Sequence, residues 1–405
     1  MPPPNPNPGS ATKKADPTFS LSSANLARFK PAKIFKNAVQ QPDPEKFSPG
    51  RMPPPNQITG MSFDDRGDYL ITAAEDECFK LWNCKTGKSS KVLYSRKYGV
   101  DLPRFLHTSS TIVYASTKED DTVRYHSLHD NKFLQYFRGH TQKVISLEVS
   151  PQADTIMSGS LDNTVRLWDV RTPLCRGLLH TPSTPIVAYD NSGMVFAVAL
   201  NGYNRICLYD QNNFDKEPFL TIHLDDISLN KISFPPRIPF ISSLSFSSNG
   251  KWLLVGTSSN CHYILDAFDG ALLAKLVGFT GLEGGKGPNH AIGVVPAQGI
   301  SGEELTWTPD SKFIISGTQE GKLVMWDISP ESGNDKKLIA TPQGSPPFEM
   351  GPSITLDGHP GPTRCVKFNP RLAMMATAGL ELAFWLPDTG GVEGEVELKK
   401  PYKTG

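Results

Sequence analysis

One histidine, one aspartate and two serines in the middle of the chain have the residue types of a hydrolase triad. A histidine held between a carboxylate and a hydroxyl can activate that hydroxyl as a nucleophile. The chain contains no Gly-x-Ser-x-Gly segment, however, which is the turn that exposes the nucleophilic serine in many hydrolases. A tryptophan also follows, and its indole N–H can donate to the same hydroxyl. We therefore interpret the group as a structural tetrad with no catalytic residue: His140, Asp162, Trp168 and either Ser158 or Ser160.

Two other segments superficially resemble ligand sites. Residues 281–288 are glycine-rich like a phosphate-binding loop, but Thr280 takes the place of its first glycine and Gly287 that of its magnesium-binding hydroxyl. Pro288 also leaves no helix start that would point at a phosphate. His126 and His129 could pair on a metal ion, but His126 falls at a strand position. We expect a flexible insertion at 281–288, no metal and no cofactor.

The composition excludes several classes of partner. Of the 405 residues, 38% are hydrophobic and 20% charged, which suffices for a sizeable core. The 41 Lys and Arg balance 41 Asp and Glu, so no overall field would hold the protein on nucleic acid or an anionic membrane. No apolar stretch approaches the roughly 18 residues of a membrane span, and the first residues lack the apolar centre of a signal peptide. We expect neither a membrane nor a nucleic-acid partner. The six cysteines form no Cys-x-x-Cys pair, which indicates a reducing compartment.

The elements that position the tetrad follow from an internal repeat. Residues 139–169 contain a Gly-His pair, three segments with strand-like alternation, polar turns between them and a terminal Trp-Asp pair. These are the parts of one WD repeat, which forms one four-stranded blade. Copies recur seven times, at Trp82, His126, Trp168, Tyr209, Leu265, Trp326 and Trp385. The sequence therefore predicts an all-β fold, a seven-bladed WD-repeat β-propeller at 27–387.

The spacing of the copies locates extra sequence. The first three intervals match the ~40–45 residues of one blade, and the last three are longer. We expect the excess in surface insertions of blades five, six and seven, at about 212–240, 278–302 and 329–353, which are rich in Pro, Gly or Ser. Residues 1–26 form a Pro-rich extension that we expect to be disordered, and residues 388–405 a flexible tail.

Ring closure needs one strand from the other end of the chain. The last repeat stops one strand short, and residues 27–35 precede the first complete unit, so we expect them to pair beside the final blade. Pro31 is tolerated there because the outermost strand has one unpaired side. Substitution of Phe29, Ile34 or Phe35 is expected to open the ring.

Five segments carry a more specific resemblance, from about residue 27 to 387. They are residues 94–102 (YSRKYGVDL), 127–132 (SLHDNK), 214–219 (FDKEPF), 265–270 (LDAFDG) and 384–387 (FWLP). In these segments the chain resembles the small WD-repeat subunits of COMPASS, the complex that methylates lysine four of histone H3. The longer extension and insertions resemble a filamentous-fungal form of that family.

The resemblance implies a nuclear adaptor with several partners and no catalytic residue. These partners are the methyltransferase subunit of COMPASS and, in fungi, a regulatory subunit of the cleavage and polyadenylation factor. It also implies contact with the phosphorylated C-terminal repeats of RNA polymerase II. We expect extended partner peptides to lie across loops around one rim of the ring. The candidate contact residues are Arg96, Lys97, Tyr98, Asp101, Arg104, His129, Asp130, Arg138 and Lys143.

Two other functions remain open from the sequence. Residues 168–171 (WDVR) match the docking motif of WD-repeat substrate receptors of cullin ubiquitin ligases, although residues 326–329 (WDIS) lack the arginine. An enzyme with carboxylates in the channel of the ring is the second alternative. The acidic residues of the strands show no paired spacing that would support general acid–base chemistry.

Overall fold

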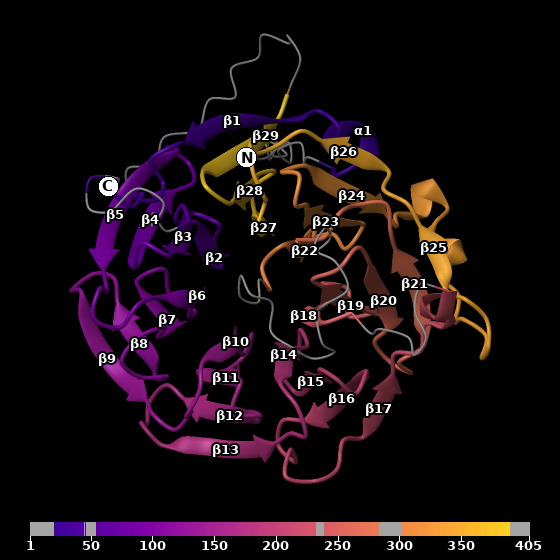
Figure 1. The fold of residues 1–405 in the computed structure, drawn as a ribbon, viewed down its shortest axis with the longest axis horizontal. Coiled ribbons are helices and arrows are strands. Elements are labelled where there is room, and N and C mark those ends of the chain that lie inside the picture. Colours follow the sequence, from indigo (N-terminus) through magenta and orange to yellow (C-terminus); the bar gives the residue numbers. More distant parts are fainter. Residues whose placement is uncertain (1–19, 44, 46–53, 232–238, 283–301, 389–405) are drawn as a thin grey trace, which may run out of the picture.

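The ring has seven sheets, in agreement with the seven repeats. The computed structural model describes residues 20–43, 45, 54–231, 239–282 and 302–388. Seven β-sheets surround a central axis like the blades of a propeller (Figure 1). Six blades have four strands and blade five has five. The predicted seven-bladed all-β propeller is confirmed.

Blades one to four each run in chain order from an inner to an outer strand. Blade one contains β2 (Ile58–Phe63), β3 (Tyr69–Ala74), β4 (Cys78–Asn83) and β5 (Lys88–Tyr94). Blade two contains β6 (Asp101–Phe105), β7 (Thr111–Ala115), β8 (Val123–Ser127) and β9 (Lys132–Phe137). Blade three contains β10 (Val144–Val149), β11 (Thr155–Ser160), β12 (Thr164–Asp169) and β13 (Cys175–His180). Blade four contains β14 (Pro185–Tyr189), β15 (Val195–Leu200), β16 (Arg205–Asp210) and β17 (Leu220–His223).

Blades five and six are interleaved along the chain, because a strand from the sequence of blade six joins the sheet of blade five. Blade five contains β18 (Ile241–Phe246), β19 (Trp252–Thr257), β20 (His262–Asp266) and β21 (Leu272–Leu276). Its fifth strand, β25 (Phe348–Met350), pairs in parallel with β21. Blade six contains β22 (Leu305–Trp307), β23 (Phe313–Gly317), β24 (Leu323–Asp327) and β26 (Ile354–Leu356). The short helices of this half are η2 (Ile227–Lys231), η3 (Pro330–Ser332) and η4 (Asp335–Lys337).

Blade seven joins both ends of the described chain. Its strands β27 (Cys365–Phe368), β28 (Met375–Ala378) and β29 (Leu382–Pro387) come from the last repeat. The outermost strand is β1 (Phe29–Phe35), which pairs antiparallel with β29 (Figure 1). Closure of the ring by an N-terminal strand is therefore confirmed, with Pro31 on the outermost strand.

The side chains of β1 contribute unequally to closure. Phe29 is buried, and the ring of Phe35 lies 4.5 Å from that of Trp82 in blade one and 5.2 Å from that of Phe384 (centroid distances). Ile34 is 46% exposed. The expectation that Ile34 helps to close the ring is wrong, because successive strand residues point to opposite sides and Ile34 faces water.

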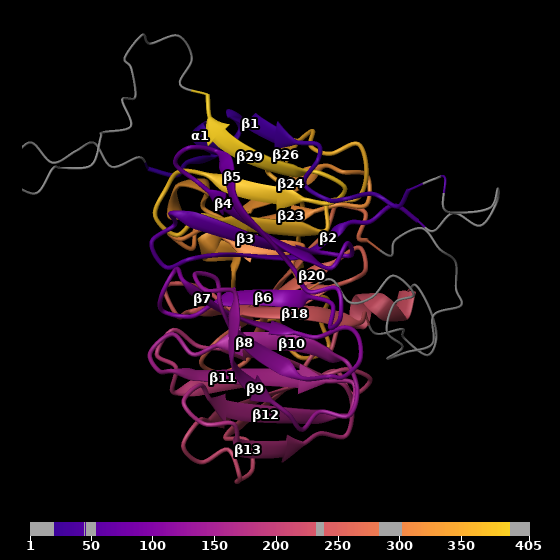
Figure 2. The same ribbon diagram turned by 90° about the vertical axis from the view of Figure 1, so that its left-hand side faces the viewer.

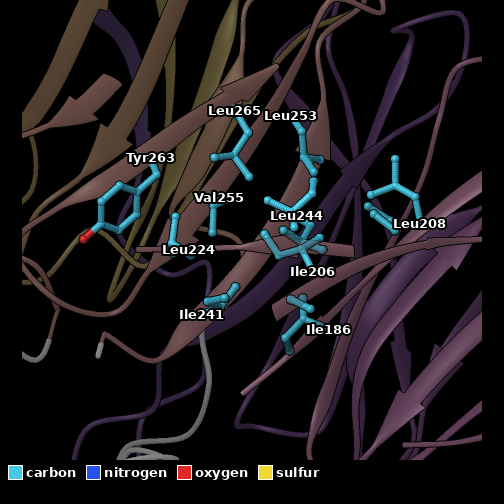
Figure 3. Close-up of a cluster of buried hydrophobic side chains, with 14 of the residues drawn as sticks. Ile186, Ile206, Leu208, Leu224, Ile241, Leu244, Leu253, Val255, Tyr263 and Leu265 are labelled. Atoms are coloured by element: carbon cyan, nitrogen blue, oxygen red, sulfur yellow. The ribbon is translucent and has the colours of Figure 1, made fainter. Parts of the chain in front are cut away.

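The hydrophobic core is divided among the junctions between blades. Among the described residues, seven clusters of buried side chains join neighbouring blades, and the cluster between blades four and five also includes Ile145 of blade three. The cluster between blades four and five includes Ile206, Ile241 and Leu253 (Figure 3). Middle strands are covered on both sides, so all six residues of β11 are buried, whereas the outer strand β5 is mostly exposed. Each blade therefore depends on both neighbours for its stability.

Turns alternate between two faces of the ring. Pairing in blade two places Asp101, Ala115, Val123 and Phe137 at one end of the sheet and Phe105, Thr111, Ser127 and Lys132 at the other. We call the face with the connection 95–100 the linker face. The face with the turn 128–131 is the hairpin face.

The boundaries expected for the extension and the insertions need correction. Helix α1 (Ser23–Leu26) lies inside the segment 1–26 that we expected to be disordered, and Leu26 is fully buried against blades six and seven. The segment 212–240 contributes β17 to blade four, and 329–353 lies within blade six and supplies β25 to blade five. Residues 1–19, 232–238, 283–301 and 389–405 lie outside the described residues, and so does most of the glycine-rich segment 281–288.

Candidate partner-binding surface

Four side chains of blade three are linked by hydrogen bonds. Trp168 Nε1 donates to Ser158 Oγ at 2.9 Å, His140 Nε2 lies 2.8 Å from the same oxygen, and His140 Nδ1 lies 2.9 Å from Asp162 Oδ2. Ser160 instead donates to the carbonyl of Gln142 at 2.8 Å. Burial lowers the pKa of His140, which favours the neutral imidazole. Ser158 is fully buried, so no substrate can reach the hydroxyl that a hydrolase would use.

Other blades contain parts of this arrangement. In blade seven Trp385 Nε1 donates to Thr377 Oγ1 at 2.7 Å, and His359 Nε2 lies 2.8 Å from that hydroxyl. In blade one Trp82 Nε1 donates to Thr72 Oγ1 at 3.0 Å. The repeated bonds tie the second and third strands together and have no access to solvent, which is a structural role.

The nine candidate contact residues do not share one rim. Arg96, Lys97, Tyr98 and Asp101 lie in or beside the connection 95–100, on the linker face, as do Arg138 and Lys143 beside the connection from blade two to blade three. Lys143 Nζ lies 3.4 Å from Asp101 Oδ2. His129 and Asp130 occupy the turn on the hairpin face. The expectation of loops around a single rim is therefore wrong, because the strands between these groups run from one face to the other.

Arg104 occupies the central channel. Its guanidinium lies 3.2 Å from Glu148 and 2.6 Å from Glu303, and Lys367 Nζ lies 2.8 Å from the other oxygen of Glu303. Burial would raise the pKa of Glu303, but Arg104 and Lys367 outweigh it and the pKa is lowered. The four residues line a cavity of about 200 Å³ together with serines of β18. Their charges compensate one another, so Arg104 braces this part of the channel.

A surface of aromatic and cationic side chains covers the outer rim of blades one and two, next to the linker face. β5 and β9 lie on this side of the ring (Figure 2). Its members, which we call the aromatic–cationic patch, are Tyr94, Arg96, Lys97, Tyr98, Arg124, Phe133, Tyr136 and Arg138. The guanidinium carbon of Arg124 lies 3.7 Å from the ring centroid of Tyr98, and those of Arg96 and Arg138 lie 5.2 Å from Tyr94 and 5.4 Å from Tyr136.

Arg124 fixes the centre of the patch. Its side chain is 2% exposed, and its two terminal nitrogens donate to Asp120 at 2.9 and 2.8 Å. Burial would raise the pKa of Asp120, but the hydrogen bonds from Arg124 outweigh it and lower the pKa. Around this centre Tyr94 is 59% exposed, and Arg96 and Lys97 are exposed. The arrangement can bind a peptide that carries both an anionic group and an apolar side chain.

The structure separates the two histidines considered as a metal pair. His126 lies in β8, buried and stacked on Phe133 with ring centroids 5.1 Å apart, whereas His129 is exposed on the hairpin face. Among the residues that the structure describes, no three His, Cys, Asp or Glu side chains converge as a metal site. Within the same ranges no helix is long and apolar enough to cross a membrane.

Known proteins resemble this chain both in its repeats and over most of its length. The family model described as WD domain, G-beta repeat matches residues 51–83, 131–169 and 303–327. A Drosophila melanogaster protein named WD repeat-containing protein 82 is 39% identical over 369 residues, which cover 91% of this chain and 98% of the relative. The chain belongs to the WD repeat-containing protein 82 family.

Fungal relatives show a similar extent of agreement. The Schizosaccharomyces pombe protein named Set1 complex component swd2 is 35% identical over 91% of this chain and 99% of its own length. The Saccharomyces cerevisiae protein named COMPASS component SWD2 is 29% identical over 92% of this chain and 99% of its own length. The likeness to the WD repeat-containing protein 82 family therefore covers the whole propeller and exceeds a match of isolated repeats.

Several residues of the aromatic–cationic patch were missed from the sequence. Arg124 and Tyr136 lie within β8 and β9 and look like ordinary strand positions. Arg124 meets the rings of both Tyr98 and Tyr136, because β8 pairs with β9 in a register that sets Arg124 opposite Tyr136. The available signal was the density of Tyr and Arg in 94–98 and 124–138.

Proposed function

We propose that this protein is a non-catalytic adaptor subunit of a nuclear COMPASS-type complex that methylates lysine four of histone H3. Support comes from the names of the fungal relatives, a Set1 complex component and a COMPASS component, which align over nearly their full lengths. The buried tetrad hydroxyl and the compensated channel charges argue for binding in place of catalysis.

The observation that carries the binding role is the aromatic–cationic patch. Arg124 is held on two sides, by Asp120 and by the ring of Tyr98, so the centre of the patch is ordered before a partner arrives. Exposed cations and rings then surround it, and such side chains dominate many protein interfaces. A segment of the methyltransferase subunit with acidic and apolar side chains fits this surface.

The same adaptor also serves mRNA 3′-end formation in this proposal. A regulatory subunit of the cleavage and polyadenylation factor and the phosphorylated C-terminal repeats of RNA polymerase II are the further partners. Phosphate groups suit Arg96, Lys97 and Arg138, because each can form charge-assisted hydrogen bonds. Partners that use the same patch would exclude one another.

A pull-down with the co-expressed methyltransferase subunit tests the assignment. The variant with Arg96→Ala, Lys97→Ala and Tyr98→Ala is expected to lose about tenfold or more of the captured subunit. The variant with His129→Ala and Asp130→Ala, on the hairpin face, is the matched control and is expected to retain it. Capture that survives the first variant and is lost in the second would move the contact to the hairpin face.

The cullin ligase receptor has less support. Trp168 of the motif is fully buried, and Arg171 is paired with Asp169 through bonds of 2.8 and 2.6 Å. Those bonds lower the pKa of Asp169 to about 2. The arginine of the motif is 72% exposed and paired only with its neighbour Asp169, and residues 326–329 lack the arginine, so the motif gives this function little support.

A further inference from the structure

Two phenylalanine side chains lie in water on the hairpin face, where blades four and five meet. Phe268 is 93% exposed and Phe219, immediately before β17, is 59% exposed. The turn 266–271 between β20 and β21 packs against β17, since a Cβ added to Gly270 would lie 2.4 Å from Ile222 (Figure 1). The turn with Phe268 therefore lies against the strand that Phe219 immediately precedes.

The turn that carries Phe268 is rigid. Phe268 N donates to Asp266 Oδ1 at 2.7 Å, Gly270 N to Asp266 O at 3.1 Å, and Ala271 N to Asp269 Oδ1 at 2.8 Å. Gly270 has a φ of 76°, a left-handed conformation that glycine adopts without strain. The backbone that carries the exposed ring is thus held in place, although the ring contributes nothing to the core. An ordered backbone loses little conformational entropy on binding, which suits an interface anchor.

Carboxylates outnumber cations in the two turns that carry the rings. The turns 210–219 and 266–271 contain Asp210, Asp215, Glu217, Asp266 and Asp269, against the cations Lys216 and neighbouring Lys251. Asp210 and Asp266 cap their own turns. Within the described part of the chain, no salt bridge joins Asp215, Glu217 or Asp269 to a cation. The rings therefore stand in a field of negative charge, which attracts a basic segment.

We propose that Phe219 and Phe268 anchor a partner segment in which Lys or Arg alternates with large apolar side chains. The apolar side chains of the segment cover the two rings, and its cations meet Asp215, Glu217 and Asp269. This anchor pair lies on the hairpin face of blades four and five, whereas the aromatic–cationic patch lies at blades one and two beside the linker face. The adaptor can thus hold two segments of opposite charge at once. The proposal rests on the adaptor function and adds a second partner chemistry to it.

The test measures binding of the full-length chain to overlapping synthetic peptides that cover the methyltransferase subunit. Fluorescence anisotropy gives the affinity of each peptide for the wild type and for Phe268→Ser and Glu217→Lys. Peptides rich in Lys, Arg and apolar residues are expected to bind about tenfold or more weakly to both variants. Tyr203→Ser is the matched control, because Tyr203 is also an exposed aromatic residue (51%) but lies in the turn between β15 and β16, on the linker face, and it is expected to change the affinity less than about twofold.

The outcomes separate this proposal from the adaptor function. Basic, apolar peptides that bind Phe268→Ser as tightly as the wild type would overturn the anchor pair, while other bound peptides would leave the adaptor intact. Binding of no peptide to the wild type would remove both. Sedimentation of the wild type as a dimer that Phe268→Ser abolishes would assign the surface to a second copy of the chain and overturn the basic partner. The exposed position of Phe268 predicts an unchanged thermal midpoint for its variant, so a loss of binding is not a loss of fold.

Discussion

Substitution of Ser158 by alanine tests whether the tetrad stabilises the propeller. Ser158 Oγ accepts the indole N–H of Trp168 at 2.9 Å and lies 2.8 Å from His140 Nε2, and all three side chains are buried. Alanine leaves two buried polar atoms without this partner. Each stranded group costs about 1–3 kcal/mol, and His140 keeps its bond to Asp162. We expect a loss of about 3 kcal/mol in the free energy of unfolding.

Equilibrium unfolding in urea measures this loss. Thr72→Val strands only the indole of Trp82, so about half the effect of Ser158→Ala is expected. Ser90→Ala, on the exposed strand β5, is the surface control and should change the free energy by less than about 0.5 kcal/mol. Equal values for Ser158→Ala and Ser90→Ala would refute the tetrad as a source of stability.

Three further predictions concern closure, the channel and acid. Phe35→Ala removes ring contacts with blades one and seven, so we expect a loss of about 2 kcal/mol in urea unfolding, and no loss would mean that β1 does not close the ring. Arg104→Met leaves the Glu303 carboxylate buried with fewer cations and is expected to lower the free energy of unfolding by about 3–5 kcal/mol. Adding Glu303→Gln should restore part of this free energy. A double-mutant cycle that shows no coupling between Arg104 and Glu303 would contradict the stabilising role of Arg104. Burial lowers the pKa of His262 to about 3. As the pH falls, the histidine of the unfolded state therefore takes up a proton before that of the folded state. The contribution of His262 to stability is complete above about pH 6.5 and is lost as the pH falls toward 3. His262→Phe should reduce the pH dependence of the urea midpoint between pH 6.5 and 4, to which the lowered pKa values of His126, His140 and His359 also contribute. An unchanged slope would contradict the buried neutral imidazole of His262.

The sequence was a good guide to the blades because each repeat is local. Trp168, Trp326 and Trp385 each sit in a third strand that pairs with its chain neighbour, so a local pattern suffices. The addition of β25 to blade five follows from no local pattern, because β25 pairs Phe348 with Ala274 and most of blade six lies between them in the sequence. Three residues of strand are too few to show a period.

The binding surfaces were less accessible to sequence reasoning. The candidate residues were neighbours along the chain, but an antiparallel strand carries the chain from one face to the other, so His129 and Asp130 lie opposite Arg96 and Lys97. Arg104 looked like a loop cation and instead pairs with Glu303, which is distant in sequence. Phe219 and Phe268 lie on neighbouring blades, and only the packing of the turn 266–271 on β17 relates them.

Purification of the tagged protein from nuclear extract at moderate salt, followed by mass spectrometry, tests the adaptor claim most directly. The account predicts recovery of histone methyltransferase subunits together with cleavage and polyadenylation subunits, and their selective loss in the Arg96, Lys97 and Tyr98 alanine variant. Recovery of a cullin adaptor without either group would contradict the account and assign this propeller to ubiquitin ligation.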